Sequence, residues 1–183
     1  AFSTLTLGGS GAIYLGSGGL VGNLGFSNTA YTVTLSGGTL GANADYSINA
    51  NGSLTGTFTI NAADPANVPH NITHLGVWSG SGSLVKIGNG SLILQSNNTF
   101  SGSTFIGAGS LVLGATGSIS NSTTITIASG ANLDATALTG GFPLNSSKTL
   151  QGFGSVLGNV SAASASIISP GSNTVTGTLT LGS

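Results

Sequence analysis

Apolar residues occur along this chain in short bursts, in which they alternate with small polar residues. Thr4–Leu7, Thr57–Ile60 and Thr124–Ile127 each alternate Thr with an apolar side chain. A period of two buries one set of side chains and leaves the hydroxyls on the opposite face of a β-strand. The pattern predicts strands at 4–7, 12–15, 32–35, 57–60, 84–87, 91–94, 110–113, 124–127 and 178–181.

A short internal repeat indicates how these strands are organised. Gly82–Val85 returns as Gly109–Val112, and Gly90–Leu92 returns as Gly117–Ile119, each 27 residues later. A period in the twenties, with short strands and Gly- or Asn-rich turns, is typical of a β-solenoid. We therefore predict an all-β chain forming one parallel β-solenoid (β-helix) domain over residues 1–183, with roughly seven to nine coils.

Two other all-β folds compete with this prediction. A β-sandwich or jelly roll is the main alternative, although its strands are usually five or six residues long. A transmembrane barrel needs strands of about ten residues and aromatic girdles, whereas aromatic residues make up only 6% here. No apolar run approaches about 18 residues, so we expect no membrane insertion. The chain starts at Ala1 rather than Met, which indicates a processed or excised polypeptide.

Charge is almost absent, and this narrows the possible partners. Charged residues make up 3% of the chain. They are Asp45, Asp64, Lys86, Asp134 and Lys148. Two cations cannot neutralise a row of phosphates, so we expect no nucleic-acid partner and no binding to an anionic membrane surface. The absence of Cys excludes disulfides, thiolate catalysis and Cys–zinc sites.

The titratable side chains offer little chemistry. His70 and His74 follow Pro69 and lead into a strand-like segment, so we expect a loop with two polar rings rather than a metal site. The Asp residues are spaced unlike the 27-residue repeat, so we do not expect stacked coils to bring them together. Acid–base chemistry on a glycoside needs two carboxylates within about 10 Å. We therefore predict no catalytic site, no cofactor and no metal.

Asn-x-Ser/Thr motifs, in which the asparagine can accept a glycan, recur along the chain. The asparagines concerned are Asn51, Asn71, Asn89, Asn97, Asn121, Asn145 and Asn159. Many of them are expected simply to form polar corners of the solenoid. A glycan on any of them would also help so uncharged a surface to stay soluble.

A longer motif lies at about residues 76–114. Residues 80–94 have the sequence GSGSLVKIGNGSLIL, residues 98–104 have NTFSGST, and residues 109–114 have GSLVLG. Together they resemble the autotransporter-associated β-strand repeat, and residues 34–42 and 150–180 resemble the flanks of that repeat. The resemblance implies a secreted or surface-displayed parallel β-helix protein of a Gram-negative-type bacterium.

The ends of a solenoid expose unpaired strand edges, which associate unless they are blocked. We identify no cap, and the candidate edge residues are Phe2, Leu5, Leu7, Leu179 and Leu181. The first functional hypothesis is therefore a secreted structural protein, a filament or matrix subunit that stacks head to tail on copies of itself.

Two other functions remain open. One is a passenger or adhesin module that binds glycans or host surfaces, which a cluster of outward aromatic residues would favour. The aromatic residues considered are Tyr14, Phe26, Tyr31, Tyr46, Trp78, Phe100 and Phe105. The other is a carbohydrate-active enzyme, which would require two of the Asp residues to lie within about 10 Å in a cleft.

Overall fold

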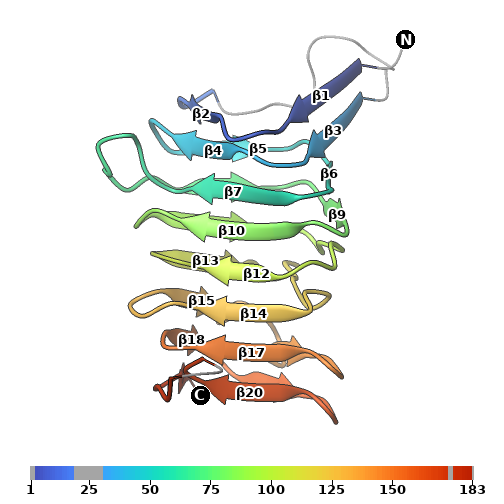
Figure 1. The fold of residues 1–183 in the computed structure, drawn as a ribbon, viewed down its shortest axis with the longest axis vertical. Helices are drawn as coiled ribbons and strands as arrows, with labels where there is room; N and C mark the ends of the chain where they lie inside the picture. Colours follow the sequence, from blue (N-terminus) through green and yellow to red (C-terminus); the bar gives the residue numbers. More distant parts are fainter. Residues whose placement is uncertain (1–2, 19–30, 173–174, 183) are drawn as a thin grey trace.

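A computed structural model describes residues 3–18, 31–172 and 175–182. None of these residues is helical, and the strands follow one another around an elongated stack of coils (Figure 1). All pairings between named strands are parallel. The described residues contain no helix that could cross a membrane. The predicted all-β parallel solenoid is therefore confirmed, with about seven turns.

Two long sheets form the broad faces of the stack. The front sheet contains, in spatial order, β2 (Ala12–Leu15), β4 (Thr39–Ala42), β7 (Thr57–Asn61), β10 (Ser83–Ile87), β12 (Thr104–Ile106), β14 (Thr124–Ile127), β17 (Thr149–Gly152) and β20 (Ile167–Pro170). The rear sheet contains β5 (Tyr46–Ile48), β8 (Ile72–His74), β11 (Ser91–Leu94), β13 (Ser110–Leu113), β15 (Asn132–Asp134), β18 (Ser155–Leu157) and β21 (Thr180–Leu181).

A third, less regular side closes each coil, and we call it the side face. Its strands are β1 (Ser3–Leu7), β3 (Tyr31–Leu35), β6 (Gly52–Leu54), β9 (Trp78–Gly80), β16 (Phe142–Leu144) and β19 (Val160–Ala162). Between β9 and β16 the chain continues along this side without named strands. There the Thr99 amide donates to the Trp78 carbonyl, and Asn97 bridges to Ser118.

The strand registers show that the 27-residue repeat is not the length of one coil. Paired residues in adjacent coils lie between 18 positions apart (Thr149 with Ile167) and 28 positions apart (Ser3 with Tyr31). Leu84 pairs with Thr104, 20 residues later, and not with Leu111, which lies on the rear sheet. A shift of 27 residues therefore spans one coil plus one further face. The sequence repeat reflects similar strands on successive faces rather than the coil itself.

Inward side chains stack into columns because parallel strands in register place equivalent residues on top of one another. One column contains Ile60, Lys86, Ile106 and Ile127. All four are at most 1% exposed, and the aliphatic members belong to a continuous core along the stack. Alternation within strands such as β10 and β14 sends every second side chain into this core, as the sequence pattern predicts.

Candidate functional site

Two carboxylates flank one imidazole, contrary to the prediction that the Asp residues lie apart. Nδ1 of His70 lies 3.7 Å from Oδ1 of Asp45, and its Nε2 lies 4.0 Å from Oδ2 of Asp64. Asp64 and His70 belong to the connection between β7 and β8, in which Ala63 pairs antiparallel with Pro69. This connection folds back on itself, so the spacing of the repeat does not predict where Asp64 lies.

Hydrogen bonds of both carboxylates hold this connection in place. Oδ1 of Asp64 accepts from the amides of Ala66 and Val68, both at 2.8 Å. Asp45 accepts from the amide of Asn71 at 2.8 Å and from its Nδ2 at 3.3 Å. The described residues contain no group of three or more side chains suited to hold a metal. These contacts attach the connection to the preceding coil.

Asp45 is the most open member of this cluster, because the side chains of His70 and Asp64 are only 19% and 23% exposed. A surface hollow of about 490 Å³ is lined by Asp45 and Asn71, but neither Asp64 nor His70 lines it. The Asp45 side chain is 65% exposed. The two carboxylates are therefore near each other but do not face one cleft, as a carbohydrate-active enzyme would require.

His74 lies in the core rather than in the polar loop that the sequence indicated. It ends β8, is fully buried and stacks on Trp78, with ring centroids 3.9 Å apart. Its Nε2 lies 3.2 Å from the carbonyl of Ala50, while Nδ1 has no hydrogen-bond partner. Burial lowers the pKa of His74 to about 4, against a smaller opposing effect of the Ala50 carbonyl. The ring is therefore neutral at pH 7.

Lys86 is also fully buried, at a position that aliphatic residues occupy in neighbouring coils. Its Nζ donates to the carbonyls of Gly88 (2.6 Å), Gly90 (2.5 Å) and Ala108 (2.8 Å). These carbonyls belong to the corners that follow β10 and β12, so one ammonium joins two coils. Burial lowers the pKa of Lys86 to about 8, which leaves the amine mainly protonated at neutral pH.

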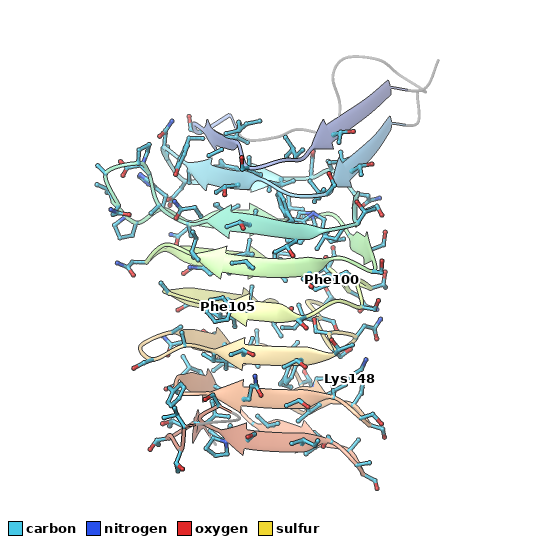
Figure 2. The ribbon with its side chains drawn as sticks, viewed as in Figure 1. Phe100, Phe105 and Lys148 are labelled. Carbon is cyan, nitrogen blue, oxygen red and sulfur yellow. The ribbon has the colours of Figure 1, made fainter. Side chains whose placement is uncertain are left out.

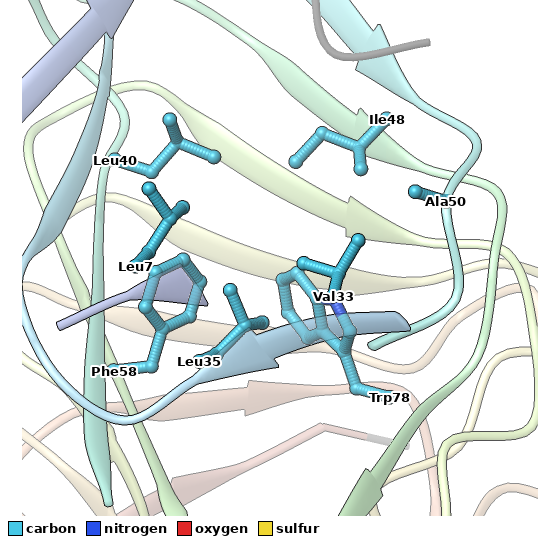
Figure 3. Close-up of a pocket in the computed structure, with 8 residues that line it drawn as sticks. All are labelled: Leu7, Val33, Leu35, Leu40, Ile48, Ala50, Phe58 and Trp78. Atoms are coloured by element: carbon cyan, nitrogen blue, oxygen red, sulfur yellow. The ribbon is translucent and has the colours of Figure 1, made fainter. Parts of the chain in front are cut away.

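The cavity drawn in Figure 3 lies inside the first coils of the stack. Its lining is wholly apolar: Leu7, Val33, Leu35, Leu40, Ile48, Ala50, Phe58 and Trp78. Its volume is about 10 Å³. A space of that size, without polar partners, has no room for a substrate or cofactor. It is a packing gap between core side chains.

Strand β1, which contains Leu5 and Leu7, and strand β21, which contains Leu181, lie at opposite ends of the stack. Leu7 packs partly buried against the core, and Leu179 is 9% exposed, whereas Leu181 is 41% exposed. The backbone of Leu5 pairs with Val33, but its side chain and Phe2 lie outside the described residues. The strands β1, β2, β20 and β21 are each at the edge of their sheets.

Two edge positions were missed by the sequence analysis. Ile13 on β2 is in register with buried Leu40 but is 47% exposed. Ile168 on β20 is in register with buried Leu150 but is 38% exposed. Both are core positions over which the described residues place no further coil. The Ile167–Ile168 pair in an uncharged segment was the signal that could have revealed the second of them.

The aromatic side chains that the structure describes do not form the outward cluster that would favour an adhesin. Tyr46, Trp78 and Phe100 are buried, while Phe105 on β12 is 39% exposed (Figure 2). Tyr14 is half-buried, and its hydroxyl accepts a hydrogen bond from Nδ2 of Asn61. Phe26 lies outside the described residues, as does the side chain of Tyr31.

All seven asparagines of the Asn-x-Ser/Thr motifs are exposed. They occupy turns and connections at the corners of the coils, such as Asn89 between β10 and β11 and Asn159 between β18 and β19. Their exposure is compatible with modification, and their hydrogen bonds differ from one site to another.

Comparison with protein families gives one match, at residues 84–113, to the model of the passenger-associated-transport-repeat. The match supports an autotransporter passenger repeat family. This passenger repeat begins within β10 and ends with β13, and it includes Lys86 and Phe100. It indicates a surface-exported passenger-type protein, at the cell surface or secreted. No curated protein and no solved structure matches the chain.

Proposed function

We propose that this chain is a structural part of a surface-exported passenger-type protein and that it stacks head to tail on a second copy to build a filament. The passenger repeat supports export. The cavity inside the first coils is apolar and only about 10 Å³ in volume, and each coil already pairs with the next through parallel strands. The same pairing chemistry would operate between copies.

The observation that carries the proposal is the edge of the last coil. Ile168 and Leu181 are in register with the buried residues Leu150 and Val156, yet they are 38% and 41% exposed. The outer backbone edges of β20 and β21 pair with no further strand in the described structure. An unpaired strand edge beside exposed apolar side chains is a template for another strand.

Charge does not oppose this contact. No Asp, Glu, Lys, Arg or His occurs in residues 1–44 or 149–183. Natural proteins commonly protect edge strands with charged side chains, above all Lys. A contact between one copy's β2 end and another copy's β20 end is heterologous. Because it adds each copy along the axis of the rod, it generates a linear assembly rather than a closed ring.

Sedimentation velocity and electron microscopy of the purified chain test this proposal. We expect elongated oligomers that grow with protein concentration. Ile168→Lys and Leu181→Lys should shift the protein to monomers, because each buries a charge in the contact. Phe105→Lys is the matched control, because it adds the same charge on the side of the rod.

Two outcomes would contradict the proposal. One is a wild-type protein that remains monomeric at the highest soluble concentration. The other is loss of assembly in Phe105→Lys to the same extent as in the edge variants, because the contact would then involve the sides of the rod. Circular dichroism confirms that each variant retains its β-structure.

A further inference from the structure

The seven motif asparagines differ in whether their side-chain amides form hydrogen bonds in the structure. Nδ2 of Asn71 donates to Oδ2 of Asp45, and Nδ2 of Asn145 donates to the carbonyl of Ser120, both at 3.3 Å. Oδ1 of Asn51 accepts from the amide of Val77 at 2.8 Å. The remaining side-chain amides make no hydrogen bond within the described structure: Asn89, Asn97, Asn121 and Asn159.

These four motifs also differ in the accessibility of the Ser or Thr hydroxyl that lies two residues after the asparagine. An enzyme that recognises Asn-x-Ser/Thr must reach both the amide and this hydroxyl. The Thr123 hydroxyl shares a hydrogen bond with Ser103 at 3.2 Å, and Ser91 is half-buried in β11, which is paired on both sides. Thr99 and Ser161, by contrast, are exposed and make no side-chain hydrogen bond in the described structure.

The two motifs with both groups free, at Asn97 and Asn159, lie on the same corner of the rod. Asn97 follows β11 and Asn159 follows β18, and both strands belong to the rear sheet. Three strand steps separate them, or about 14 Å along the rod. A row of two such sites would present sugars on one side of the stack and leave the front sheet bare.

The corner between them has room for a sugar. A hollow of about 210 Å³ is lined by Ser118, which bridges to Asn97, and by Gly141. A Cβ added to Gly141 would lie 2.8 Å from the Cβ of Asn159, so the glycine keeps a neighbouring side chain away from this asparagine. A sugar on either nitrogen could lie over the hollow without displacing a coil.

We propose that Asn97 and Asn159 are N-glycosylation sites. A glycosyltransferase would join Nδ2 of each asparagine to the anomeric carbon of a sugar activated as a glycosyl diphosphate. The bond from that carbon to the diphosphate oxygen breaks, the diphosphate leaves with the electron pair, and the amide nitrogen releases one proton. The reaction involves no oxidation or reduction. Carbohydrate on an exported chain with 3% charged residues supplies the hydration that charge supplies elsewhere.

Mass spectrometry of the protein purified from its own producing cells tests the proposal. We expect one glycan mass on the Asn97 peptide and one on the Asn159 peptide, and none on the Asn71 and Asn145 peptides. Asn97→Gln and Asn159→Gln should each remove one glycan from the intact mass. Thr99→Val and Ser161→Ala should remove the same glycans while retaining the asparagines, which separates enzymatic recognition from loss of the acceptor.

The engaged asparagines serve as internal controls, because Asn71→Gln and Asn145→Gln should leave the glycan count unchanged. Unmodified peptides at both Asn97 and Asn159 would overturn the proposal, and so would glycans on Asn71 or Asn145 instead. Neither result depends on assembly, so this test is independent of the proposed filament.

Discussion

Lys86 and His74 occupy inward positions where neighbouring coils carry aliphatic side chains. Lys86 lies between Ile60 and Ile106, and His74 lies between Ile48 and Leu94. Lys86 is fully satisfied by three carbonyls, whereas Nδ1 of His74 has no partner. The same buried environment therefore gives these two residues different roles in stability.

Replacing Lys86 should destabilise the fold. Lys86→Met retains the length of the side chain but leaves the carbonyls of Gly88 and Ala108 without their donor, whereas the Gly90 carbonyl still accepts from the Ser110 amide. We expect a loss of about 3 kcal/mol in the free energy of unfolding. Urea unfolding measures this loss. Lys148→Met is the matched control, because the Lys148 side chain lies near the surface and its Nζ donates to a single carbonyl, that of Asn121. Equal losses of stability in the two variants would show that the carbonyl contacts of Lys86 stabilise the fold no more than the single contact of Lys148.

Acid should destabilise the protein through His74. Its pKa is about 4 in the folded state, below the usual value of 6.5, so between these values the unfolded chain binds a proton that the folded chain does not. Stability therefore falls as the pH drops through this window, by about 3 kcal/mol in total from this residue. Urea unfolding at a series of pH values should show this loss in the wild type and in His70→Gln, but not in His74→Leu. A similar loss in His74→Leu would assign it to other groups.

The side face lacks named strands between β9 and β16, and single side chains provide the connections there. Asn98 is 1% exposed; its Oδ1 accepts from the amide of Trp78, and its Nδ2 donates to the carbonyl of Ser96, both at 2.8 Å. Thr104 and Ser122, both buried, share a hydrogen bond of 2.8 Å between their hydroxyls. These polar pairs keep the coil closed where no strand ladder does.

Removal of the Asn98 side chain should loosen this side. Asn98→Ala leaves the Trp78 amide without its acceptor, while the Ser96 carbonyl still accepts from the amide of Ser118. We therefore expect a loss of about 2 kcal/mol in the free energy of unfolding and faster hydrogen exchange at the Trp78 amide. Asn97→Ala, made in unglycosylated protein, is the neighbouring control and should change neither quantity. An unchanged exchange rate at Trp78 in Asn98→Ala would mean that the hydrogen bond does not protect this amide.

At the scale of the whole molecule, the stack depends on backbone pairing and apolar columns, with five charged residues in all. Contacts of this kind are little screened by salt. The two ends that we propose to meet contain no charged residue, so their association should be driven by burial of apolar surface and strand pairing.

The proposed assembly should therefore persist at high salt. Between about 0.02 M and about 1 M NaCl, the average mass measured by sedimentation should stay constant or increase, because salt screens charges but not apolar contacts. The Phe105→Lys control should behave in the same way. Dissociation at high salt would show that ion pairs hold the copies together, contrary to the contact proposed.

The sequence predicted strands best where apolar and polar residues alternate over four or five positions. The segments at 57–60, 84–87 and 124–127 correspond to β7, β10 and β14. It missed the three-residue strands, such as β5, β6 and β8, because three residues are too few to show a period of two. It also missed the four-residue strands β4, β17 and β20. It also misassigned His74 to a polar loop. The local sequence around this histidine does not show that apolar side chains of the neighbouring coils lie above and below it.

The sequence by itself determined the all-β solenoid, because strand alternation and Gly- and Asn-rich turns are local properties of the chain. Only the tertiary structure decided which residues lie on top of one another. The length of each coil varies with its connections, so sequence spacing did not reveal that Asp45 and Asp64 share His70. Likewise, the seven Asn-x-Ser/Thr motifs look alike in the sequence. The fold distinguishes them, because the side-chain amides of Asn71 and Asn145 donate hydrogen bonds and those of Asn97 and Asn159 do not.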